Sequence, residues 1–163
     1  MAITVPNCLR FLEQHPELLA PEDLQRAQRE WRTLEPILSS QHAFEAAFPH
    51  ASVQAVHGDA PFYNVIHTAS GVRYADFEDV TLGPPEWDLA GMGSEYIAAY
   101  NEAAGAAGVR PLQDDVLQVM GAARNLQLVA SLALVPQLPL LATWFGPLLD
   151  GWRSSPFAGG FTR

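Results

Sequence analysis

The sequence predicts a mainly α-helical fold that carries one small β-hairpin. Over most of the chain, apolar residues recur at three- and four-residue spacing, the pattern of amphipathic helices. Two short runs, at 65–67 and 72–75, flank a glycine-containing turn and predict the two strands of the hairpin. The chain has 163 residues, of which 48% are hydrophobic, so a single domain over 1–163 is expected.

The first 50 residues are predicted to be a helical lead-in. A short interrupted helix is expected over 6–19. Pro21, followed by two acidic residues, is a strong helix start, and the apolar spacing after it predicts a helix over 21–39. A third short helix is expected over 41–48.

Residues 53–91 are predicted to hold the polar loops of the protein. An extended run at 53–56 leads into them, and the hairpin follows. Residues 80–85 are Val-Thr-Leu-Gly-Pro-Pro, and a loop is expected there because glycine and adjacent prolines interrupt regular structure.

Residues 92–155 are predicted to form a helical subdomain. It is entered by a helix over 86–106 that is interrupted near its glycines, and it ends with an apolar helix over 139–152. Between them a long helix is expected over 112–135. Its predicted inward-facing residues are Val116, Val119, Met120, Ala123, Leu126 and Leu128.

Charge and composition exclude several classes of partner. The net charge is −9, which disfavours nucleic acid and suits a cationic small molecule. No apolar stretch is long enough to span a bilayer, so no membrane association is expected. The N-terminus lacks signal-peptide features and Cys8 is the only cysteine, so a cytoplasmic protein without an internal disulfide is expected.

Two polar motifs lie at the two ends of the predicted hairpin. Residues 57–64 are His-Gly-Asp-Ala-Pro-Phe-Tyr-Asn, and residues 76–79 are Asp-Phe-Glu-Asp. Asp59 is a candidate base, whereas Asn64 and Asp76 offer the oxygen ligands that Mg²⁺ prefers. Such a set can hold a hydroxyl and a divalent metal against a nucleotide phosphate. Each aspartate is alternatively an ordinary turn residue.

The residues beside the candidate base are expected to support the loop. Gly58 lets the backbone turn tightly, and His57 is expected to hydrogen-bond to backbone. A zinc site is not expected, because His57 and His67 have no second ligand pair at metal spacing. A metal-dependent phosphoesterase remains a weaker alternative use of the same cluster.

Four sequence motifs in order resemble the aminoglycoside phosphotransferase and choline kinase family, which shares the protein-kinase fold. They are His57-Gly58-Asp59-x-x-x-x-Asn64, Asp76-Phe77-Glu78, Gly83-Pro84 and Trp87-Asp88-Leu89-Ala90. The resemblance covers residues 53–91 closely and the flanking helices loosely.

This resemblance implies a role for each matching residue. Asp59 would accept or orient the acceptor hydroxyl, Asn64 and Asp76 would bind Mg²⁺, and ATP would donate the phosphate. Asp88 would brace the catalytic loop.

The resemblance also implies where an acceptor would bind. Glu95, Tyr96 and Glu102 lie on the helix where this family builds its acceptor pocket. Glu78 stands beside the metal position and is a further candidate for substrate binding.

The chain resembles only the C-terminal lobe of such a kinase, with the N-terminal β-lobe absent. It contains no lysine, because all nine basic residues are arginine, and no glycine precedes Gly58. A complete kinase uses a lysine and a glycine-rich loop to hold the nucleotide phosphates. A fragment, a truncated gene product or a lobe completed by another chain would each explain this.

Two functions are therefore expected from different classes. One is an ATP-dependent phosphotransferase acting on a small-molecule hydroxyl; the alternative is a pseudokinase-like binding or regulatory module without transfer activity. Phe62, Val65, Ile66 and Phe77 are expected to be partly bare without a second lobe. This surface is predicted to form a homodimer, to bind a complementing N-lobe chain or to be capped by the N-terminal helices.

Overall fold

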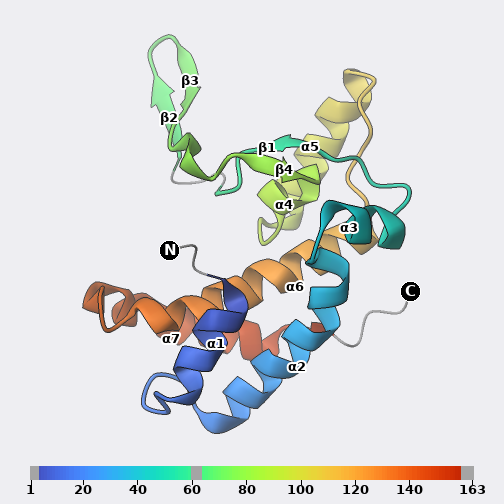
Figure 1. Cartoon of the computed structure of the whole chain (residues 1–163). Helices are drawn as coiled ribbons and strands as arrows, with labels where there is room; N and C mark the ends of the chain where they lie inside the picture. The colour runs from blue at the N-terminus through green and yellow to red at the C-terminus, as the bar shows by residue number, and fades with distance from the viewer. Residues whose placement is uncertain (1–3, 60–63, 159–163) are drawn as a thin grey trace. The chain divides into compact units, whose positions relative to one another are not determined.

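The computed structural model describes residues 4–59 and 64–158, which are mainly helical (Figure 1). The chain divides into two compact units, one of residues 1–43 and 122–163 and the other of residues 44–121. The expectation of a single domain over 1–163 stays a prediction. Within the described ranges, no helix has both the length and the apolar character needed to cross a membrane.

The first unit begins with two helices that pack against each other, α1 (Val5–Glu13) and α2 (Pro21–Leu38). Both carry a proline at the start, and α2 adds two acidic side chains in its first turn, as predicted. Leu12 of α1 and Leu34 of α2 are fully buried. The helix predicted over 21–39 is therefore confirmed, but its packed face differs from the predicted one, since Glu30 and Ile37 are buried while Trp31 is half-buried.

The rest of the first unit comes from the C-terminal part of the chain. It comprises the end of α6 (Asp114–Ala130), 3₁₀ turns at Ser131–Leu134 and Pro139–Leu141, and α7 (Ala142–Ser154). The α-helix predicted over 112–135 is thus too long. Leu128 was also placed wrongly, because it is 38% exposed while Val129 is 2% exposed. Two residues turn a helix by about 200°, so Leu128 lies opposite the buried Leu126.

A buried polar cluster joins α2 to α7 in this unit. Glu30 is 2% exposed and accepts hydrogen bonds from Arg26 Nε at 3.0 Å and from Trp152 Nε1 at 2.9 Å. The Arg26 guanidinium lies 4.5 Å from the centroid of the Trp152 ring. Arg26 also donates to the carbonyl oxygens of Arg153 and Ser155, at 2.8 and 2.9 Å. These contacts tie the end of α7 to the middle of α2.

The second unit holds the short strands and the helices around them. In chain order its elements are α3 (Gln41–Ala47, which begins in the first unit), β1 (Gln54–Val56), β2 (Val65–Thr68), β3 (Gly71–Tyr74), a 3₁₀ turn (Phe77–Asp79), β4 (Thr81–Gly83), α4 (Pro85–Leu89), α5 (Ser94–Ala106) and the start of α6. The predicted hairpin is confirmed, since β2 and β3 pair antiparallel with Val65 opposite Tyr74. The predicted break before α5 is confirmed as well.

The loop predicted over 80–85 is wrong in its first half. Thr81–Gly83 forms β4, which pairs antiparallel with β1 in a second two-stranded sheet, so that Val56 faces Thr81. The prolines follow the strand instead of interrupting it, and they start α4, which lies beside β1 (Figure 1). A Cβ on Gly83 would lie 3.2 Å from Val56 Cγ2, so glycine lets the two strands pack closely.

Candidate active site

Asp88 of α4 holds the backbone that leads into Asp59. Its Oδ2 accepts a hydrogen bond from the His57 amide at 2.7 Å, and its Oδ1 accepts one from the Gly58 amide at 3.0 Å. Hydrogen bonds to an ionised carboxylate are among the stronger ones in proteins. One side chain on a helix thereby fixes two consecutive amides of the loop.

His57 connects this loop to the second motif. Its Nε2 lies 2.7 Å from the carbonyl oxygen of Ala75. A carbonyl only accepts, so Nε2 carries the proton and donates it. Nδ1 is buried and has no hydrogen-bond partner among the described residues. The imidazole ring also lies tilted against the Phe77 ring, with ring centroids 5.0 Å apart.

The hairpin brings Asn64 next to the residue that precedes Asp76. The Ala75 amide donates to the Asn64 carbonyl at 2.9 Å, which extends the pairing of Val65 with Tyr74. The Asn64 side chain then donates from Nδ2 to the Asp59 carbonyl oxygen at 2.6 Å. Asn64 therefore contacts the backbone of both motifs.

Asp76 has a strained backbone. Its φ of 62° and ψ of 59° are left-handed, and it is the only non-glycine residue with positive φ in the described part of the chain. Aspartate tolerates this region better than most residues do, yet the conformation still costs energy. Strain of this kind gathers at functional sites, where it aims a side chain.

Gly58 is a position where only glycine fits. Its φ is +89°, and a Cβ built there would lie 2.1 Å from the carbonyl oxygen of Asp79. The loop that carries Asp59 therefore lies directly against the segment that follows Asp76. The two motifs, which the hairpin separates in the sequence, form one local structure.

The predicted base and the two predicted Mg²⁺ ligands differ in exposure. Asp59 and Asp76 are exposed and Asn64 is half-buried. Within residues 4–59 and 64–158, no three His, Cys, Asp or Glu side chains are grouped to hold a metal. The predicted site contains the amide of Asn64, which is not one of these four residue types. The binding of Mg²⁺ by Asn64 and Asp76 therefore stays a prediction.

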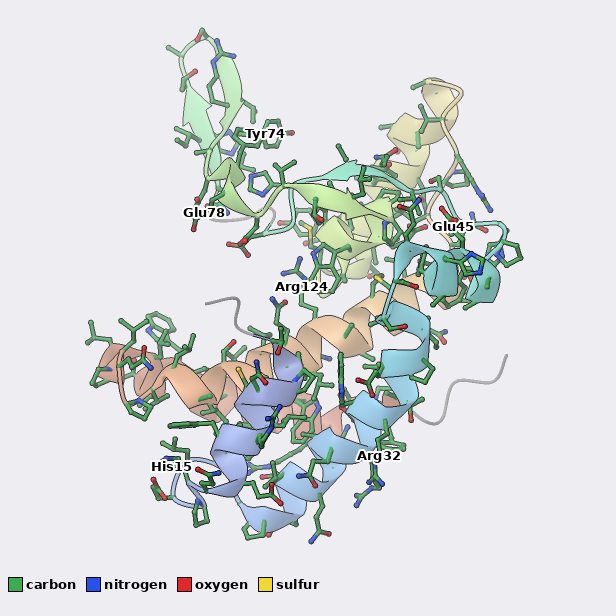
Figure 2. All side chains as sticks on the ribbon, in the orientation of Figure 1. His15, Arg32, Glu45, Tyr74, Glu78 and Arg124 are labelled. Carbon is green, nitrogen blue, oxygen red and sulfur yellow. The ribbon has the colours of Figure 1, made fainter. Side chains whose placement is uncertain are left out.

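The predicted acceptor residues are all exposed. Glu78 lies on the 3₁₀ turn after Tyr74 and Asp76, as Figure 2 shows for the labelled Tyr74 and Glu78. Glu95 and Glu102 lie two turns apart on α5, and Tyr96, which follows Glu95, is 39% exposed. Their role in acceptor binding stays a prediction.

The expected bare apolar surface is partly present. Ile66 is 50% exposed and Phe77 is 58% exposed, while Val65 is half-buried. Phe62 lies outside the described residues. The predicted homodimer or complementing chain stays a prediction.

Two contributors to the site were not foreseen from the sequence. Trp87, next to Asp88, donates from its indole Nε1 to the Gly58 carbonyl at 2.8 Å. Glu86 is 3% exposed and accepts the Gln113 amide through Oε1 at 2.8 Å, which anchors α4 to the start of α6. A hydrogen bond from a side chain to a backbone atom cannot be predicted from the residue types involved. The position of Trp87 beside Asp88 was nevertheless a sign that it lies near the loop.

The close approach at Gly58 gives a stability prediction. We expect Gly58→Ala to destabilise the protein by about 2–3 kcal/mol, because it adds a backbone clash to an unfavourable φ. Gly91 is the matched control, with φ of +83° and nothing within 4 Å of where an alanine Cβ would lie, so Gly91→Ala should cost only about 1–2 kcal/mol. Urea denaturation of both variants measures the difference, and equal losses would contradict the clash.

Comparison with protein families gives a match over most of the chain. The family model described as "Phosphotransferase enzyme family" matches residues 3–142, which is most of the chain. No curated protein and no solved structure matches this chain.

Proposed function

Because the chain belongs to the phosphotransferase enzyme family, we propose that it supplies the catalytic and metal-binding half of an ATP-dependent phosphotransferase. The proposed acceptor is a hydroxyl of a small molecule, of the amino-sugar or choline class. The net charge of −9 favours a cationic acceptor and disfavours nucleic acid.

The observation that carries the proposal is the position of Asn64. Its amide nitrogen donates to the Asp59 carbonyl, and its backbone carbonyl accepts from Ala75, the neighbour of Asp76. The Asn64 amide oxygen is the atom able to bind a cation, and the contacts of Asn64 with backbone atoms join this residue to Asp59 on one side and to the neighbour of Asp76 on the other.

The proposed roles follow from the chemistry of phosphoryl transfer. Asp59 accepts or orients the proton of the attacking hydroxyl, and its loop is held by Asp88 and His57. Asn64 and Asp76 hold Mg²⁺, which when bound neutralises charge on the nucleotide phosphates. The left-handed backbone of Asp76 sets the direction of its carboxylate.

The nucleotide phosphates need a partner that this sequence does not provide. The chain has no lysine, and from residue 4 to β1 its regular elements are the helices α1, α2 and α3. A covering loop and a lysine are the parts that hold ATP phosphates in kinases. We therefore propose that a polypeptide segment outside this sequence adds them, and that without it this chain binds Mg²⁺-ATP through Asn64 and Asp76 and transfers phosphate at a reduced rate.

The missing lysine also favours the second candidate. A pseudokinase-like module would keep the braced loop and the acceptor side, would bind a partner chain and would transfer no phosphate. The two candidates differ in whether the chain binds Mg²⁺-ATP through Asn64 and Asp76.

Isothermal titration with Mg²⁺-ATP separates the two candidates. We expect binding by the wild-type chain and a loss of at least about tenfold in Asp76→Asn, since even outer-shell changes at metal sites cost 10–100-fold. Asparagine tolerates the left-handed backbone, so this variant removes only the charge. The control is Asp114→Asn, an exposed aspartate of α6. A folded wild-type chain that binds no Mg²⁺-ATP would favour the module.

A further inference from the structure

Trp87 holds the peptide group that leads into Asp59. Its indole N–H donates to the Gly58 carbonyl at 2.8 Å. We infer that Trp87 is a positioning residue, whose hydrogen bond fixes the direction of the Asp59 side chain. This inference rests on the proposed function of Asp59 and deepens it.

The physical reason lies in the freedom of glycine. Gly58 has φ of +89°, and glycine adopts positive and negative φ with similar ease. Without hydrogen bonds to hold it, Gly58 would therefore let the peptide group between Gly58 and Asp59 rotate. Asp88 holds the Gly58 amide nitrogen, and Trp87 holds the Gly58 carbonyl oxygen. With both ends held, both dihedral angles of Gly58 are set.

The effect passes directly to Asp59. The peptide between Gly58 and Asp59 is planar, so fixing the Gly58 carbonyl also fixes the Asp59 amide and Cα. On the other side, Asn64 Nδ2 holds the Asp59 carbonyl at 2.6 Å. The proposed base thus stands between two restrained peptide groups, one held by an indole and one by the proposed metal ligand.

The indole is itself carried by an anchored helix. α4 starts at two consecutive prolines, packs on β1, and is fixed to Gln113 through the buried Glu86. Trp87 and Asp88 are consecutive on this helix and hold opposite ends of the same glycine. If Trp87 served only to pack against its neighbours, its indole N–H would not be needed. The hydrogen bond is therefore the part of the inference that an experiment can test.

The first test measures the hydrogen bond without catalysis. In ¹H–¹⁵N spectra, we expect the Trp87 indole N–H to exchange with solvent at least about tenfold more slowly than that of Trp144, which is 71% exposed. Trp87→Phe should shift and broaden the Asp59 amide signal, whereas Trp144→Phe should leave it unchanged. Equal exchange of the two indoles, or an unchanged Asp59 signal, would overturn the inference even if the protein transfers phosphate.

The second test measures positioning through a double-mutant cycle. Transfer from Mg²⁺-ATP to kanamycin and to choline serves as the assay. We expect Trp87→Phe to lower kcat about tenfold with KM nearly unchanged, and to add little in the Asp59→Asn background. Equal losses in both backgrounds would show a merely structural role and overturn the inference. If the wild type transfers no phosphate while the spectroscopic result holds, the proposed function fails and the Trp87 restraint on Asp59 stands.

Discussion

Replacing Asp59 with asparagine is expected to lower phosphoryl transfer by about 10²–10⁴-fold, the range that a positioned general base contributes. Asparagine has nearly the same shape, and the backbone contacts of the loop do not depend on the carboxylate. The Asp59 carbonyl would still accept from Asn64, and the Gly58 carbonyl from Trp87. The loss would therefore report the missing base and not a collapsed loop. Transfer of labelled phosphate from ATP to aminoglycosides or choline measures it.

The control for this prediction is an aspartate with no assigned role. Asp114→Asn removes the same charge from the exposed first turn of α6 and should leave transfer unchanged. A circular dichroism spectrum and an unfolding midpoint equal to those of the wild type would show that the Asp59→Asn variant is correctly folded. Turnover retained in Asp59→Asn would contradict the assignment of the base.

The elements predicted well from the sequence are those with a local cause. α2 begins at Pro21, where a fixed φ and two acidic neighbours favour a helix start, and its apolar residues repeat at helical spacing. The β2–β3 hairpin is also local, since its strands are joined by a two-residue turn. In such segments the residues that decide the structure are neighbours in the chain.

β4 shows where local reasoning fails. Thr81–Gly83 is only three residues long and borders Pro84, so nothing in its own sequence marks it as a strand. Its partner β1 lies some 25 residues earlier, and the pairing depends on Gly83 leaving room for Val56. Strand pairing across such a distance depends on tertiary structure more than on the propensity of either segment.

The candidate site divides in the same way. The motif named Asp59, Asn64 and Asp76 through residue type and order. The sequence also led us to expect that His57 would bond to backbone and that Asp88 would brace the loop. It could not predict the accepting atoms, because the Ala75 and Gly58 carbonyls accept from His57 and Trp87 by backbone position alone. A backbone acceptor can belong to any residue type. The sequence therefore predicts which side chains could react, and the structure adds how they are restrained.

Replacing Glu30 with alanine is expected to destabilise the protein by about 3–5 kcal/mol, the usual loss when one partner of a buried ion pair is removed. Glu30 is 2% exposed and satisfies both Arg26 and the indole N–H of Trp152. Its removal leaves the Arg26 charge without its carboxylate partner and the Trp152 indole N–H without its acceptor. Urea denaturation followed by circular dichroism measures the loss.

The pattern among related variants distinguishes this network from simple packing. Glu30→Gln keeps one acceptor oxygen and the side-chain volume, so we expect a smaller loss of about 1–3 kcal/mol from the unsatisfied donor. Glu35→Ala removes an exposed carboxylate from the same helix and should change stability by no more than about 0.5 kcal/mol. If Glu30→Ala costs as little as Glu35→Ala, Glu30 does not hold the two helices together. A large loss in Glu30→Ala with a small one in Trp152→Phe would instead assign the network to Arg26, which keeps its contacts with the Arg153 and Ser155 carbonyls in both variants.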